Sequence, residues 1–261
     1  MSAVADTQAV HTFDNGIKVH HRHLIPVQVD RYAQGVNLHE PEEERLFLGL
    51  IAESDPSGTF LDVGAAVGYY GILAKRSAPS LKIHAFEPYA RHRQFLLENL
   101  QLNGLDSSAV VLHAEAVGAA RGRSDFKIEH YGSTLVSGNP RAGGTLRERF
   151  KKLRSRWRLR AAPERDGETI EVSVTTLDEF TRRNGPAELV KVDVQGFEID
   201  VLRGAVGAMT SKLIGRWLIG THGEVVHREC AEILREHGYR IEVDSPFVPG
   251  QPDGVIIAKA A

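Results

Sequence analysis

Short apolar runs alternate with amphipathic stretches from about residue 59 to the C-terminus. The amphipathic stretches predict helices over residues 69–77, 89–102, 177–183 and 225–237, and one that ends at Leu202. The apolar runs predict strands over residues 59–63, 82–86, 110–117, 170–174, 189–194, 217–220, 240–243 and 255–259. Strands that alternate with helices form βαβ units, and two final strands joined by a short loop form an antiparallel hairpin. The pattern therefore predicts an α/β fold with about seven mainly parallel strands, a C-terminal antiparallel hairpin and helices on both faces.

Residues 1–58 precede this pattern. Residues 1–40 look irregular, and Pro41 then opens a helix over 42–52 whose first turn is acidic, as the helix dipole favours. His20, His21 and His23 lack the spacing of metal ligands, so we expect them on the surface. The sequence thus predicts an N-terminal segment and helix, 1–58, followed by a ligand-binding domain, 59–261.

The composition is that of a soluble globular protein, with 42% hydrophobic and 25% charged residues and a net charge of −2. Bulk charge therefore does not favour nucleic acid as a partner. Cys230, the single cysteine, allows no disulfide within the chain, fits a reducing cytoplasm, and is expected in the core. The sequence shows neither a signal peptide nor an apolar run long enough to span a membrane, so we expect a cytoplasmic protein.

A basic insertion at about residues 138–168 breaks the alternation. Residues 141–160 carry nine Lys or Arg against one acid, Glu148. Three interpretations stay open: a solvated surface segment, a lid that recruits an anionic substrate, and a nucleic-acid contact. Apart from Phe150, only Trp157 places an aromatic ring among these charges. A stacking platform for single-stranded nucleic acid is therefore not indicated.

A glycine-rich turn follows the first predicted strand of the domain. Gly64 lets the chain turn sharply and lets a ligand approach the backbone, and Gly68 opens the next helix, whose amides can meet a polar ligand. The spacing is Gly-x-x-x-Gly, not the Gly-x-Gly-x-x-Gly that binds a dinucleotide pyrophosphate. Asp62, just before the turn, can face a cationic amino group.

An acid at the tip of the second strand strengthens this interpretation. Glu87 lies 19 residues after Gly68, where a carboxylate can accept hydrogen bonds from both ribose hydroxyls. Glu115 and Ala116, at the third strand, are placed beside a base ring. The site therefore suits a nucleoside without a pyrophosphate. The predicted cofactor-binding residues are Asp62, Gly64, Ala65, Gly68, Tyr69, Tyr70, Glu87, Pro88, Glu115 and Ala116.

These motifs resemble the FkbM family of S-adenosylmethionine-dependent methyltransferases. The resemblance is carried by Leu61-Asp62-Val63-Gly64-Ala65, Phe86-Glu87-Pro88, Ala116-Val117-Gly118 and, most strongly, by residues 191–205, KVDVQGFEIDVLRGA. It covers the chain from about Leu61 onward, apart from the basic insertion. It implies a class I methyltransferase, Rossmann-like fold, S-adenosylmethionine as cofactor, and O-methylation of a sugar or natural-product hydroxyl. Ala66 and Gln195 stand where the family often has Asn and Glu.

Methyl transfer to a hydroxyl needs a proton acceptor or a Lewis-acidic metal. Asp193 ends an apolar strand, His222 follows the next strand, and both are expected at the ligand-binding edge of the sheet. Glu198 either joins them or only complements a helix dipole. These three are the predicted catalytic residues. Alternatively, Asp193, His222 and Glu224 hold Mg²⁺, which prefers oxygen ligands.

The expected acceptor is a small molecule, and residues 1–58, with His39 and Glu40 before the helix, are expected to cover its pocket. The alternatives are an RNA ribose or protein methyltransferase, a nicotinamide-dependent oxidoreductase and a non-catalytic binding module. The glycine spacing disfavours the oxidoreductase. The sequence leaves open whether the chain forms a homo-oligomer.

Overall fold

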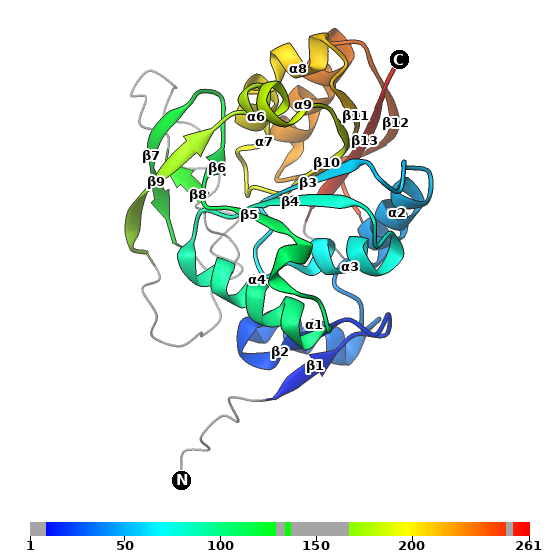
Figure 1. Ribbon diagram of the computed structural model, residues 1–261, viewed down its shortest axis with the longest axis vertical. Helices are drawn as coiled ribbons and strands as arrows, with labels where there is room; N and C mark the ends of the chain where they lie inside the picture. Colours follow the sequence, from blue (N-terminus) through cyan, green and yellow to red (C-terminus); the bar gives the residue numbers. More distant parts are fainter. Residues whose placement is uncertain (1–8, 129–133, 137–166, 249–252) are drawn as a thin grey trace.

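A seven-stranded sheet forms the centre of the protein in the computed structural model, which describes residues 9–128, 134–136, 167–248 and 253–261 (Figure 1). The strand order is β12-β13-β11-β10-β3-β4-β5. The strand β13 runs in the direction opposite to the other six. The strands are β3 (Thr59–Val63), β4 (Lys82–Phe86), β5 (Val111–His113), β10 (Ala187–Val192), β11 (Ile214–Thr221), β12 (Tyr239–Ser245) and β13 (Gly254–Ala260). This topology confirms the predicted class I methyltransferase fold with its C-terminal antiparallel hairpin.

Helices cover both faces of this sheet, and each face has its own core (Figure 1). On one face Phe60 and Leu218 pack with Phe47 and other residues of α2 (Pro41–Ala52), α3 (Tyr69–Ser77) and α4 (Ala90–Leu102). On the other, Trp217 and Val190 pack with α6 (Leu177–Asn184), α7 (Glu198–Arg203), α8 (Val206–Thr210) and α9 (Glu224–Glu236). Cys230 of α9 is fully buried, as predicted. Within the described ranges, no helix has the length and apolar character that crossing a membrane requires.

A second, four-stranded sheet was not expected from the sequence. Its order is β6-β9-β7-β8, with β6 (Ala116–Val117), β7 (Gly122–Lys127), β8 (Thr134–Val136) and β9 (Thr169–Thr175). The strand predicted over 110–117 is thus two strands in different sheets, and the strand predicted over 170–174 lies outside the main sheet. An apolar run indicates a strand but not its partner. Here Phe126, Val172 and Val174 form a small core of their own.

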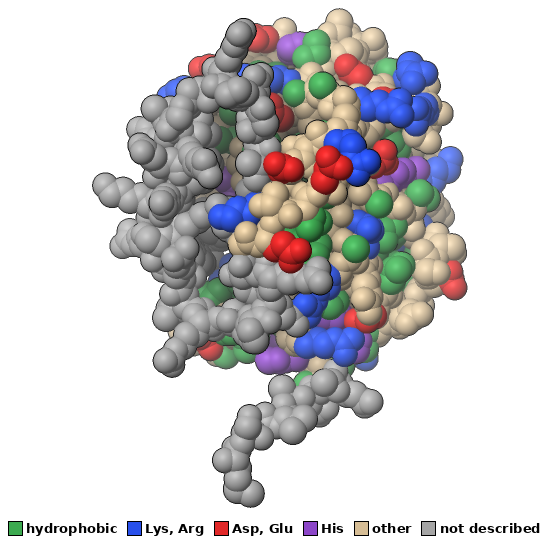
Figure 2. Space-filling model, turned by 90° about the vertical axis from the view of Figure 1, so that its left-hand side faces the viewer, with side chains coloured by type: hydrophobic (Ala, Val, Ile, Leu, Met, Phe, Trp, Pro, Cys, Tyr) green, Lys and Arg blue, Asp and Glu red, His purple; other side chains and the backbone are tan. Residues whose placement is uncertain are grey.

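The face that carries this second sheet shows charged side chains of both signs interspersed among its described residues (Figure 2). Arg123 and Glu171, on neighbouring strands β7 and β9, form an exposed ion pair of 2.6 Å there. The predicted basic insertion lies almost entirely outside the described residues, since the chain is described again only from Gly167.

The N-terminal segment was predicted to be irregular, but its described part is folded against α4. It contains the hairpin β1 (Val10–Thr12) and β2 (Lys18–His20), a short 3-10 helix (His21–His23) and α1 (Pro26–Gln34). The backbone amide of Lys18 donates to the side-chain oxygen of Asn103, at 2.9 Å. Strands of three residues are too short to show a two-residue period, which is why the pattern did not predict them.

His23 is buried, contrary to the surface position expected for it. Its ring stacks on Phe95 with centroids 3.9 Å apart, and its Nδ1 lies 3.0 Å from the side-chain oxygen of Asn99. Burial lowers the pKa of His23 to about 4, although the Asn99 bond and Glu98 act to raise it. The folded state therefore holds this ring neutral over a range in which the unfolded chain binds a proton.

We expect this histidine to make folding pH-dependent. Its contribution is fully present above pH 6.5, the ordinary pKa, and is lost as the pH falls toward about 4. That loss is on the order of 3 kcal/mol for a shift of this size. Urea unfolding across this range should therefore show a shallower loss of stability in His23→Gln than in the parent chain. The variant of its exposed neighbour, His21→Gln, should retain the parent slope. Equal slopes in all three proteins would contradict the prediction.

Candidate active site

The strand order of the main sheet reverses between β3 and β10. Ligands of open α/β sheets bind outside the carboxyl ends of the strands at such a point. Here the backbone amide of Asp193, just past β10, donates to the carbonyl of Val63 at the end of β3, at 3.0 Å. The segments that follow the two strands are thereby held side by side. The glycine turn after β3 and Asp193 after β10 consequently lie together at this edge, as predicted.

The turn after β3 is packed so closely that neither of its two glycines has room for a side chain. Gly64 has φ +88°, and a Cβ placed on it would lie 1.9 Å from the carbonyl oxygen of Asp193. Gly68 has φ +83°, and its Cβ would lie 2.6 Å from Cγ of Leu96. Ala65, also predicted here, is buried, and its amide donates to the carbonyl of Phe86 at 3.1 Å. Glycine is therefore required at both positions by conformation and by space.

Two buried carboxylates flank this turn, as the sequence predicted. Glu87 accepts from the amides of Ala66 and Tyr89, at 3.0 and 2.8 Å, which fixes the carboxylate against the turn. Asp62 is 2% exposed, and among the described residues its Oδ2 has no hydrogen-bond partner. Burial, together with the neighbouring acids and despite Lys191, raises the pKa of Asp62 to about 6. A buried acceptor without a partner is costly unless a ligand supplies a donor.

The other predicted cofactor residues are spread around the turn. Glu115 is half-buried between β5 and β6, and Ala116 is buried on β6, where it pairs with β9. Pro88 follows Glu87, and its carbonyl accepts from Arg93 at 2.7 Å. Tyr69 and Tyr70 face the N-terminal segment. Their hydroxyls donate to Glu44 at 2.7 Å and to Glu40 at 3.0 Å.

The three predicted catalytic residues lie together after β10 and β11. Nε2 of His222 lies 3.7 Å from Oδ1 of Asp193, and its Nδ1 lies 2.8 Å from Oε1 of Glu198. Glu198 is fully buried and also accepts from the amide of Gly196, at 3.0 Å. It thus ties His222 to the loop that carries Asp193, which is more than a helix-dipole role. The sequence did not indicate Asp253, whose Oδ1 lies 3.0 Å from Nε2 of His222.

The charges of this group assign different roles to its members. Burial acts to lower the pKa of His222, but Glu198 and Asp253 outweigh it and hold that pKa well above the ordinary value. Burial likewise opposes ionisation of Asp193, yet Lys191 and His222 keep its pKa below the usual range. His222 is therefore an imidazolium without a free lone pair, and Asp193 is a carboxylate. In this arrangement Asp193 is the group that can accept a proton.

The three predicted Mg²⁺ ligands do not form a metal site among the described residues. Glu224 is an exposed residue at the start of α9, whereas Asp193 and His222 are largely covered. Over the described ranges, no three His, Cys, Asp or Glu side chains are grouped so that they could hold a metal ion. Nε2 of His222, the nitrogen nearest Asp193, faces the carboxylate of Asp253 instead of a metal position. The structure therefore gives the alternative of a metal site no support.

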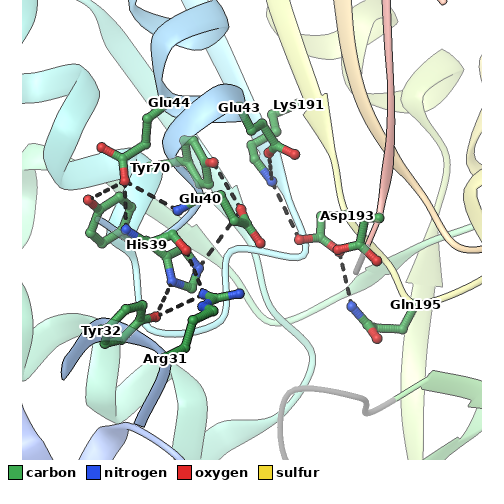
Figure 3. A network of polar contacts seen from close by, with 12 residues as sticks. Arg31, Tyr32, His39, Glu40, Glu43, Glu44, Tyr70, Lys191, Asp193 and Gln195 are labelled. Atoms are coloured by element: carbon green, nitrogen blue, oxygen red, sulfur yellow. Dashed lines mark hydrogen bonds and ion pairs between the residues drawn. The ribbon is translucent and has the colours of Figure 1, made fainter. Parts of the chain in front are cut away.

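A buried ion-pair network beneath Asp193 was missed by the sequence analysis (Figure 3). Lys191, 2% exposed, lies 3.1 Å from Oε1 of Glu43 and 3.6 Å from Oδ2 of Asp193, with its ammonium over the Tyr70 ring. Although burial disfavours its charge, these carboxylates raise the pKa of Lys191. A lysine inside an otherwise apolar strand was the one signal of this network, because lysine is almost never fully buried unless it is paired.

Comparison with known proteins identifies the family of this chain. The Methyltransferase FkbM domain family matches residues 62–241. Methyltransferase sdnD of Sordaria araneosa is 30% identical over 208 residues, covering 73% of this chain and 72% of that protein. 31-O-demethyl-FK506 methyltransferase FkbM of Streptomyces tacrolimicus is 27% identical over 220 residues, covering 76% and 78%.

Among solved structures, methyltransferase FkbM from Methylobacillus flagellatus KT superposes with a TM-score of 0.49 at 14% identity. The match covers 78% of this chain and 44% of that one. The family match spans most of this chain and includes both the glycine turn and Asp193. The chain belongs to the FkbM family of methyltransferases.

Proposed function

We propose that this protein transfers the methyl group of S-adenosylmethionine to a hydroxyl of a small molecule, a sugar or a natural product. The observation that carries the proposal is an ionised, partly exposed Asp193 beside the glycine turn, at the point where the strand order reverses. The name of the Streptomyces tacrolimicus relative, a 31-O-demethyl-FK506 methyltransferase, describes methylation of an oxygen and supports the same chemistry here.

The residues around the turn fit S-adenosylmethionine. Glu87 is fixed by two backbone amides and retains lone pairs for the ribose hydroxyls. Among the described residues no donor reaches the buried Oδ2 of Asp62, and the cofactor's ammonium group would supply one. Gly64 lets the backbone of Asp193 approach the turn closely, which keeps the two halves of the site together. When bound, the cofactor supplies a methyl group that is already activated for displacement.

The protein's own contribution is to orient the acceptor and take its proton. A neutral alcohol is a weak nucleophile, so a positioned base is expected to raise the rate. Asp193 is 23% exposed at the open edge and stays ionised through Lys191 and His222. Glu198 and Asp253 hold His222 in place as positioning residues. We assign the role of general base to Asp193.

The N-terminal segment would complete the acceptor pocket. Tyr32 and Arg31 of α1 bind His39, with 2.7 Å from the Tyr32 hydroxyl to Nδ1 of His39 and 2.5 Å from Arg31 to its carbonyl (Figure 3). This fixes His39 and Glu40 over the Tyr69–Tyr70 end of α3. We propose that this part of the N-terminal segment covers a small acceptor beside Asp193.

Methyl transfer can be tested with purified protein. We expect S-adenosylhomocysteine to bind the folded chain in a calorimeter. We also expect label from methyl-labelled S-adenosylmethionine to reach the oxygen of an acceptor in a panel of sugars and polyhydroxylated natural products. An RNA transcript and a denatured protein mixture serve as alternative acceptors. Transfer of label only to those two, or to a nitrogen, would contradict the proposal, and so would a folded protein that binds neither form of the cofactor.

A further inference from the structure

The buried edge of the sheet carries more acid than base. Two cations lie there, Lys191 and the protonated His222. His39 adds no charge, because burial and then Arg31 lower its pKa to about 3. The acids that surround these cations are Glu40, Glu43, Asp62, Asp193, Glu198 and Asp253, each buried or nearly so. Even when the buried Glu44 and the cation Arg31 beside His39 are counted, the carboxyl groups outnumber the cations, which suits a further positive charge.

Burying a charge without a partner costs free energy, so some of these carboxyl groups must be protonated before a ligand binds. Burial, followed by Glu43 and Asp193, raises the pKa of Glu40 well above its ordinary value. Asp62 lies directly beside Lys191 in the sheet register, and its Oδ2 still has no partner among the described residues. A cation that entered here would therefore meet acceptors that the protein's own donors do not satisfy.

Glu40 is the acid of this group that the N-terminal segment contributes opposite Asp193. It stands just before α2, where the Tyr70 hydroxyl donates to its Oε2 at 3.0 Å, and Nε2 of His39 lies 4.0 Å from the same atom. Figure 3 shows the Glu40 carboxyl between Tyr70 and Asp193. The other charged groups around it are Glu43 and Glu44 on α2, Lys191 on β10, and Asp253 before β13.

We propose that Glu40 determines specificity for the charge of the cofactor, so that the site binds the sulfonium S-adenosylmethionine in preference to its neutral thioether product. This inference rests on the proposed function. The reaction converts an alcohol and a sulfonium into a methyl ether and a thioether, and the released proton goes to Asp193. The ligand's positive charge disappears in that step. The acidic surroundings therefore favour the reactant cofactor and promote release of the product.

Binding calorimetry on the intact chain tests this with Glu40→Gln. The amide can still accept from Tyr70 but cannot ionise when a cation binds, so the variant changes the charge of the occupied site and little else. We expect the parent protein to bind S-adenosylmethionine about tenfold more tightly than S-adenosylhomocysteine, as one desolvated charge pair allows. Glu40→Gln should abolish most of this preference and leave the affinity for S-adenosylhomocysteine nearly unchanged. Glu42→Gln, the same change at an exposed residue in the first turn of α2, should behave as the parent protein.

A second measurement needs no variant. Sinefungin carries an ammonium group in place of the methylated sulfonium, so the parent protein should bind it more tightly than S-adenosylhomocysteine. The inference is wrong if the parent protein binds all three ligands equally, or if Glu40→Gln weakens charged and neutral ligands alike. A folded parent protein that bound none of them would overturn the proposed function as well, which separates the two failures.

Discussion

Changing Asp193 to asparagine should lower kcat by about a hundred- to ten-thousand-fold, the usual contribution of a positioned general base. Asparagine has nearly the same shape as aspartate and can still contact Gln195, which donates to Oδ1 of Asp193 at 3.2 Å. It cannot take the proton from the acceptor hydroxyl. Single-turnover rates with saturating S-adenosylmethionine would measure the loss, and calorimetry would show whether the cofactor still binds.

Asp200→Asn is the matched control for this variant. Asp200 lies on α7, seven residues later, and forms a partly exposed pair with Arg203 at 3.7 Å. Removing its charge should leave kcat within about twofold of the parent, as expected of a partly exposed ion pair. A near-normal rate in Asp193→Asn would move the proton acceptor elsewhere. Equal losses in both variants would indicate a general effect of lost charge.

The elements on either side of the glycine turn could be predicted from the sequence to the residue. Strands β3 and β4 and helix α3 have the predicted bounds, because each apolar run there is bounded by turn or cap residues. The cofactor turn was equally accessible, since Gly64, Gly68 and Glu87 lie within one βαβ unit. In such a unit, residues close in sequence are also close in space, so spacing alone carries the geometry.

The parts of the site that depend on distant contacts could not be predicted in this way. Lys191 meets Glu43 across 148 residues, and His222 meets Asp253 across 31. Glu43 looked like a favourable acid in the first turn of a helix, which is its usual role. Its partner is set by how α2 packs on the sheet, and a single sequence does not record that packing. The second sheet was missed for the same reason, because its short strands find partners only in the folded chain.

The change with the largest expected effect on the fold of the site is Gly64→Ala. Alanine at φ +88° is strained, and its Cβ would lie 1.9 Å from the carbonyl oxygen of Asp193, so the ends of β3 and β10 would have to separate. Strain and overpacking together should lower the free energy of unfolding by about 3 kcal/mol. Cofactor binding should be lost, because the turn and Asp193 both move.

Gly104→Ala separates the effect of backbone strain from that of overpacking. Gly104 has φ +72°, but a Cβ placed on it meets nothing within 4 Å. This variant should therefore show the strain alone, about 1 kcal/mol, with cofactor affinity unchanged. Urea unfolding and calorimetry on the two variants measure both quantities. If Gly64→Ala lost no more stability than Gly104→Ala and still bound S-adenosylhomocysteine, β3 and β10 would not be in the close contact on which the cofactor site depends. If it lost binding alone, the turn would serve the ligand and the contact would not be needed for folding.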